Sequence, residues 1–125
     1  MSFKNRYEIL LQSSQATEES IAITREIVHL VERRYQIRLD ESNGASLVTH
    51  LAITLKKIQE QEALIEIPEI CLQEAHSYLE EMEFAGELVQ YLHDNHGIDF
   101  NKSESAFLTI HLKNITQHIN TKEVS

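Results

Sequence analysis

The sequence predicts an all-α fold in which five helices form an antiparallel bundle. The first observation that favours helices is the scarcity of turn residues, since only three Gly and one Pro occur among 125 residues. The second is the recurrence of apolar residues at helical spacing over several long segments, without the sustained alternation typical of strands. The third is the composition, with 42% hydrophobic and 25% charged residues, which is typical of one globular domain.

The N-terminal half is expected to hold two long helices, at residues 18–37 and 45–61. Residues 1–16 precede them as an N-terminal arm or a short helix. Thr17 is the expected N-cap of the first long helix, because a threonine hydroxyl accepts a hydrogen bond from the first helical turn. The segment Asp-Glu-Ser-Asn-Gly at residues 40–44 is the clearest loop of the chain. The apolar stripes of the two helices are Ile23, Ile27, Leu30 and Val31, and Leu47, Leu51, Leu55 and Ile58.

The C-terminal half is expected to hold three further helices. Pro68 fits the first turn of a short one, and the next runs from about residue 79 to 95 and ends at Gly97. Ser103 is the expected N-cap of the last helix. These boundaries give one helical domain over residues 17–120, followed by a C-terminus expected to fray over residues 121–125. The stripe of the last helix consists of Leu108, Leu112, Ile115 and Ile119.

The charge balance limits the classes of partner. A formal net charge of −9 disfavours direct binding to nucleic acid, where affinity comes mainly from Lys and Arg contacts to phosphates. The same charge disfavours anionic membranes, and no apolar run is long enough for a signal peptide or a membrane span. The single cysteine, Cys71, cannot form an internal disulfide. We therefore expect a cytoplasmic protein without contacts to membrane or nucleic acid.

Two of the seven histidines lie at the edge of a predicted packing stripe. At 100° per residue, His50 lies about 95° from the stripe of its helix, on the same side as Thr54 and Lys57. His111 lies about 70° from the stripe of the last helix, on the side that carries Glu104. Such an imidazole is either a half-buried filler satisfied by one neighbour, or a group held well enough to react or switch. The pattern alone leaves both interpretations open.

The residues around these histidines form two motifs. Residues 47–57 carry His50 in a mainly apolar segment, and residues 104–112 place an acidic residue seven positions before His111 among apolar residues. A connector, Gly-Ile-Asp-Phe at residues 97–100, precedes the second motif. These segments resemble the first and second histidine motifs and the connector of the PTS regulation domain (PRD) family. The resemblance runs from about residue 17 to 119 and is more specific at the second motif.

The resemblance implies a PRD-like bundle that forms a homodimer and is phosphorylated on His111 and His50. The implied donor is a histidine phosphocarrier protein or a sugar-specific component of the phosphotransferase system. Phosphorylation would then modulate dimerisation or partner binding in the transcriptional control of carbohydrate uptake. Such a chain is a regulator and not an enzyme, and at 125 residues it has no room for an RNA- or DNA-binding output domain.

The match to the family is closer around one histidine than around the other. Thr49 and Lys57 stand where many members have Asp and Arg, so His50 departs further from the pattern than His111 does. Glu104, Lys57 and Thr54 are the expected supporting residues. Glu104 is placed to orient the imidazole before transfer and to repel the phosphoryl group afterwards.

Three other interpretations compete with phosphorylation. The i, i+3 pair of His93 and His96 has the spacing of two ligands for one metal ion, although no complete ligand set accompanies it, and we expect no metal and no cofactor. Cys71 lies among apolar residues, where a free cysteine behaves as a small hydrophobe and not as a nucleophile. The remaining alternative is a structural or protein-interaction subunit whose histidines carry no phosphoryl chemistry.

Overall fold

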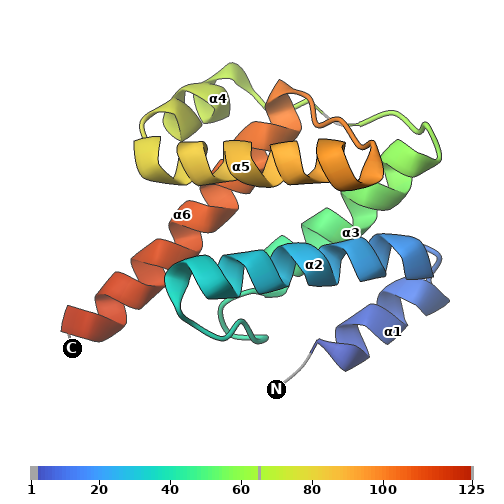
Figure 1. The fold of residues 1–125 in the computed structure, drawn as a ribbon, viewed down its shortest axis with the longest axis horizontal. Coiled ribbons are helices and arrows are strands. Elements are labelled where there is room, and N and C mark those ends of the chain that lie inside the picture. Colours follow the sequence, from blue (N-terminus) through green and yellow to red (C-terminus); the bar gives the residue numbers. More distant parts are fainter. Residues whose placement is uncertain (1–2, 65, 125) are drawn as a thin grey trace. The chain divides into compact units, whose positions relative to one another are not determined.

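The structure is a computed structural model that describes the backbone of residues 3–64 and 66–124 and the side chains of these residues up to Ile119 (Figure 1). This part of the chain contains six helices and no strand. The chain divides into two compact units, residues 1–64 and 65–125, each of which is described by itself. The helices are α1 (Lys4–Gln12), α2 (Glu18–Tyr35), α3 (Ala45–Gln59), α4 (Glu69–His76), α5 (Leu79–His96) and α6 (Lys102–Val124).

The all-α prediction is confirmed, but the count of five helices is wrong. The additional helix is α1, in the segment that we expected to be an arm or a short helix. Phe3, Tyr7 and Leu10 follow one another at helical spacing, and each is no more than 6% exposed. These three apolar contacts hold α1 as a helix although it is only nine residues long. The antiparallel arrangement of the helices stays a prediction.

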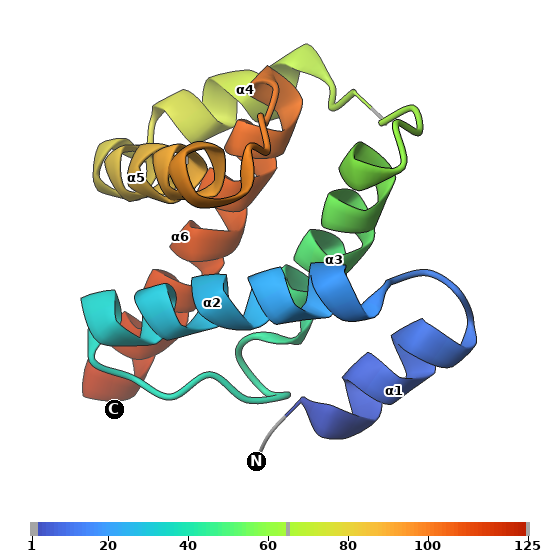
Figure 2. The same ribbon diagram turned by 45° about the vertical axis from the view of Figure 1, so that its right-hand side comes forward.

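In the first unit, α2 and α3 pack against each other and carry most of the buried apolar residues (Figure 2). Thr17 caps α2 as predicted, since its side chain accepts a hydrogen bond from Ser20 N at 3.0 Å. The hydroxyl of Ser20 in turn accepts one from Thr17 N at 2.9 Å, which completes a capping box. The deeply buried side chains of these two helices include Ile27, Val31, Leu47, Leu51 and Leu55 of the predicted stripes and also Val48, which lies beside them. The stripe residues Leu30 and Ile58 are only half-buried.

In the second unit, α6 packs against both α4 and α5 (Figure 2). The break between α4 and α5 falls at Ser77 and Tyr78, just before the start predicted at about residue 79. The Ser77 hydroxyl donates to the carbonyl of Glu74 at 2.6 Å, and Tyr78 N donates to the carbonyl of Ala75 at 3.1 Å. These bonds satisfy the last carbonyls of α4 and end the helix without a glycine. Gly97 ends α5 as predicted, in the left-handed conformation with φ 64°.

The expected N-cap of the last helix is wrong by two residues. The side-chain oxygen of Asn101 accepts a hydrogen bond from Glu104 N at 2.8 Å, which is the bond of an N-cap. The hydroxyl of Ser103 instead accepts one from Ile67 N at 3.2 Å. Asn and Ser are equally good caps, so tertiary contact decides between two candidates this close in sequence.

The last helix continues to Val124. The fraying expected over residues 121–125 concerns residues whose side chains lie outside the described part of the chain, and it stays a prediction. Among the helices described here, none is both long enough and apolar enough to cross a membrane.

Candidate functional site

His111 lies in the middle of α6, half-buried as its position beside the stripe predicts. Its ring stacks on Phe107, one turn earlier, with 6.4 Å between the ring centroids and 27° between the ring planes. A stacked aromatic neighbour restricts rotation of the imidazole and leaves part of it accessible. His111 is therefore held in place without being sealed from solvent.

Phe107 also links His111 to the packing of α4. It contacts a small apolar cluster whose buried members are Ile67, Ala75 and Ala106. Ala75 is the one buried residue of α4, an eight-residue helix. An element with so few buried contacts opens at a low free-energy cost. The other half-buried members of the cluster are Cys71, Leu72 and Ile110, so Cys71 takes part in apolar packing.

Glu104 lies in the first turn of α6 and is only 3% exposed. A carboxylate at this end of a helix is stabilised by the helix dipole. Glu104 and His111 are seven residues apart and therefore share one face of the helix, with roughly 10 Å of axial rise between them. The two predicted residues are thus aligned on α6, two turns apart.

His50 lies in α3, in the first unit, and is also half-buried. Its Nε2 is 3.4 Å from Oγ1 of Thr54, one turn later, and Thr54 is 5% exposed. This separation is at the weak end of hydrogen bonding. Lys57 is half-buried and seven residues after His50, so the three residues follow one face of α3. The helix therefore brings together the three residues predicted around the first motif.

A polar network beside His50 was not predicted from the sequence. Arg6 of α1 donates three hydrogen bonds to Glu41, at 2.7, 2.9 and 3.2 Å, and a further one to Oγ1 of Thr49 at 2.9 Å. The hydrogen bonds between Arg6 and Glu41 raise the pKa of Arg6 and lower the pKa of Glu41. Thr49 precedes His50 directly, so this network fixes the start of the helical turn that carries the histidine.

A histidine–aspartate pair lies at the end of α5. Nδ1 of His93 is 2.6 Å from Oδ1 of Asp99, and the two side chains are 57% and 79% exposed. Two backbone hydrogen bonds place the aspartate, from Gly97 N to the His93 carbonyl at 3.0 Å and from Ile98 N to the Leu92 carbonyl at 3.2 Å. The first of these bonds, from the left-handed glycine to the carbonyl four residues earlier, is that of the αL motif at a helix end. The hydrogen bond to Asp99 is the main cause of a raised pKa at His93.

The raised pKa of His93 predicts a pH-dependent contribution to stability. Because the folded pKa lies above the unfolded value of about 6.5, the pair stabilises the fold below that pH and stops doing so as pH rises through the folded pKa. Replacing Asp99 by Asn should therefore lower the melting temperature at about pH 6 more than at about pH 9. A difference between the parent and the variant that is the same at both pH values would contradict this. An NMR titration of His93 should show its midpoint move down in the variant.

The metal interpretation of His93 and His96 finds no complete ligand set. Within residues 3–64 and 66–119, no group of three or more His, Cys, Asp or Glu side chains is arranged to hold a metal ion. His93 pairs with Asp99, and the ring of His96 lies edge-on to Tyr91 with 6.1 Å between centroids. We therefore expect a chelator to leave the melting temperature unchanged, because no metal adds to the folding free energy. A fall of several degrees, reversed by added zinc, would identify a metal site.

Comparisons with known proteins give one match. Neither the curated proteins nor the solved structures contain a significant match to this chain. The family model of the PRD domain matches residues 25–115, a range that includes both His50 and His111. Because this match spans most of the 125 residues, the chain belongs to the PRD domain family.

Proposed function

We propose that this chain senses sugar supply by accepting a phosphoryl group on His111 and, more weakly, on His50. PRD domains form a regulatory family, not a catalytic one, and are controlled by the sugar phosphotransferase system. The donor is a phosphocarrier protein or a sugar-specific component of that system. Phosphorylation changes homodimer formation or partner binding in the transcriptional control of carbohydrate uptake.

The observation that carries this proposal is the contact between His111 and Phe107. A phosphoryl group on the imidazole adds about −1.5 to −2 charges, by analogy with phosphorylated hydroxyls. That charge arises beside the ring of Phe107, which packs against the apolar cluster that includes Ala75 of α4. Glu104, aligned with His111 on α6, repels it further. The added charge is therefore unfavourable in the present packing of Phe107, and α4 is the weakly held element that responds.

His50 has a different environment, which supports a weaker acceptor. Thr54 contacts its Nε2 at 3.4 Å, which competes with the approach of a donor to that nitrogen. Lys57, on the same face, provides a cation for a phosphoryl group once it is formed. The Arg6 network at Thr49 occupies the position where many PRD domains carry an aspartate. His50 thus has a charge partner for the product, but no carboxylate at that position to raise its reactivity.

The consequence for self-association can be measured directly. Light scattering of the chain across a concentration series, before and after incubation with the donor system, should show the dimer equilibrium shift by about tenfold, which is roughly 1.4 kcal/mol. The variant His111→Ala is the control and should show a much smaller shift. A chain that stays monomeric at high micromolar concentration in both states would contradict the dimer. Labelling with an unchanged equilibrium would place the response in partner binding.

A second candidate function is protein interaction without phosphoryl chemistry. The observation in its favour is the exposure of two large apolar side chains around α4, Ile70 at 74% and Leu79 at 69%. Replacing both by Ser should abolish partner binding and leave phosphoryl transfer intact if that function is the correct one. If the parent chain is never labelled by any donor, this function replaces the first.

A further inference from the structure

We infer that His93 is a further phosphoryl acceptor of this domain, with Asp99 as its positioning residue. Neither histidine motif of the sequence contains His93, and it lies on a different helix from His50 and His111. The inference rests on the proposed function for the identity of its physiological donor. Its chemical basis is the geometry of the pair at the end of α5.

The contact with Asp99 determines which nitrogen of His93 reacts. An ionised carboxylate can only accept hydrogen bonds, so the 2.6 Å contact requires that Nδ1 of His93 carries the proton. In the neutral imidazole the lone pair then lies on Nε2, at the opposite side of the ring. A carboxylate–imidazole pair of this kind holds the ring in one tautomer and favours positive charge on it. His93 is thus prepared as a nucleophile through Nε2.

The backbone holds this pair together before any donor arrives. The hydrogen bonds from Gly97 N and Ile98 N back to α5 fix the chain between His93 and Asp99, and Ile98 is only 4% exposed. Asp99 therefore follows a buried anchor and a left-handed glycine, Gly97, that fixes the direction of the chain. Placing the carboxylate costs little further conformational entropy, since its backbone is already ordered. A His93–Asp99 pair that only stabilised the end of α5 would have the same backbone. The reactivity of His93 therefore distinguishes a phosphoryl acceptor from a purely structural pair.

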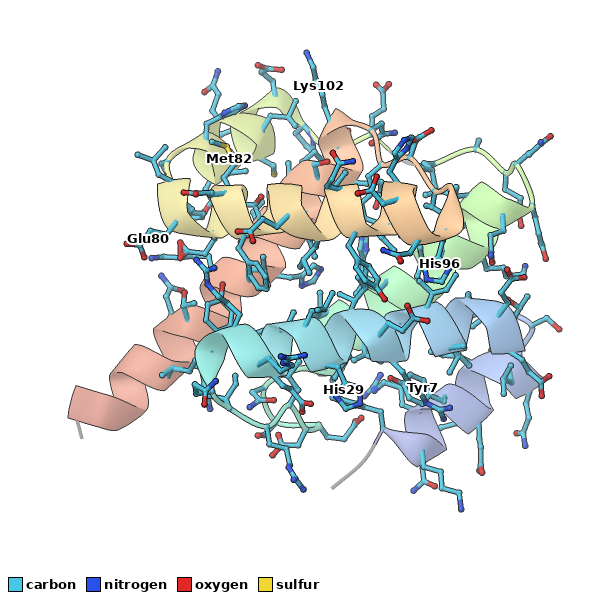
Figure 3. The ribbon with its side chains drawn as sticks, in the orientation of Figure 1. Tyr7, His29, Glu80, Met82, His96 and Lys102 are labelled. Carbon is cyan, nitrogen blue, oxygen red and sulfur yellow. The ribbon has the colours of Figure 1, made fainter. Side chains whose placement is uncertain are left out.

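The pair is also accessible to a protein donor. With 57% of the His93 side chain exposed, the ring can meet a phosphohistidine on another protein. His96, labelled in Figure 3 near the same end of α5, has its ring edge-on to Tyr91. His76 offers a comparison, since it ends α4, is exposed, and contacts no carboxylate within the described residues. The two exposed histidines at helix ends differ in the presence of Asp99.

The transfer step balances without an additional reactant. The Nε2 lone pair of His93 attacks phosphorus, and the P–N bond of the donor phosphohistidine breaks. The donor ring enters with a proton on its other nitrogen and leaves as neutral imidazole. His93 retains its Nδ1 proton and becomes a phosphorylated imidazolium, whose positive charge faces the Asp99 carboxylate. Asp99 thus stabilises charge that develops during the transfer.

Phosphoramidate, a small P–N donor, tests this inference without the donor protein. The chain is incubated with it near neutral pH, and the label on each histidine is quantified by peptide mapping. We expect His93 to be labelled about tenfold faster than His76, the rate equivalent of one charge-assisted hydrogen bond. The variant Asp99→Asn should remove this advantage. Asp94→Asn is the matched control, because it removes a neighbouring carboxylate that is bonded to Gln90 and is only the smallest of the causes that raise the pKa of His93. It should change the His93 rate far less than Asp99→Asn does.

The outcomes separate this inference from the proposed function. Equal rates at His93 and His76, or an Asp99→Asn variant with an unchanged His93 rate, would overturn the inference and leave a purely structural pair. The proposed function is tested with the protein donor and the label on His111. Label on His93 but not on His111 would refute the proposed function alone, and the reverse result would refute this inference alone. The pH–rate profile of His93 should shift to lower pH in Asp99→Asn, a change that lost stability would not produce.

Discussion

Replacing His111 by Ala should remove most of the acid-labile, base-stable label that the donor system introduces. The acceptor nitrogen is lost, while the half-buried position of the ring limits the effect on stability to about 1 kcal/mol. His50→Ala should remove a smaller part of the label, because Thr54 lies 3.4 Å from Nε2 of His50 and a threonine precedes His50 where many PRD domains carry an aspartate. The measurement is the amount of label per chain after a fixed time, with the donor in excess.

The double variant decides whether these two residues were assigned correctly. If the chain with both substitutions is labelled as fully as the parent, the acceptors lie elsewhere. Circular dichroism of each variant should match the parent, which excludes unfolding as the cause of lost label. If the double variant keeps a small amount of label and this label maps to His93, the result agrees with the further inference. It does not mean that His111 was wrongly assigned as an acceptor.

Replacing Leu112 by Ala should lower the stability of the fold and leave labelling nearly unchanged, the reverse of what we expect for His111→Ala. Leu112 is adjacent in sequence but fully buried, at 0% exposure, so the substitution removes apolar contacts and leaves a cavity. Leu→Ala changes at such positions cost about 2–5 kcal/mol. With a cost near 3 kcal/mol, the melting temperature should fall by roughly 10 °C in a domain of this size. Thermal unfolding followed by circular dichroism measures this shift.

The labelling rate supplies the second readout for Leu112→Ala. At a temperature where the variant remains folded, His111 should be labelled at nearly the parent rate, because its ring and Phe107 are unchanged. If folded Leu112→Ala loses as much label as His111→Ala does, labelling depends on core packing and not on the His111 ring. We thus expect Leu112, in the apolar stripe of α6, to contribute to stability, and His111, beside the stripe, to contribute to labelling.

Much of the fold could be predicted because the apolar stripes are regular. The stripes through Ile27 and Leu51 located α2 and α3 to within two residues at each end. The sequence predicts α1 only as an arm or a short helix, since three buried apolar residues over two turns give a weak periodic signal. The cap at Asn101 was missed because its choice over Ser103 depends on a contact to Ile67, far away in sequence.

The candidate site was predictable only where a single helix contains it. His50, Thr54 and Lys57 lie on one helix, so residue spacing alone places them on one face. The Arg6 network joins Arg6 to Glu41 and Thr49, which are 35 and 43 positions away in the sequence. Local residue patterns do not predict contacts over such separations. The pairing of His93 with Asp99 depends on the left-handed conformation of Gly97, which turns the chain back toward the helix end.

The most direct test of the account is NMR of the imidazole nitrogens in the unmodified chain labelled with nitrogen-15 on histidine. Spectra are recorded before and after the donor system is added, with assignments taken from single-histidine variants. We predict that a ring nitrogen of His111 takes the chemical shift of a phosphorylated imidazole, with a smaller population at His50, and that both signals disappear on mild acid treatment. Spectra in which His111 is unchanged while the donor is demonstrably charged would contradict the central claim, that His111 is the principal phosphoryl acceptor of this domain.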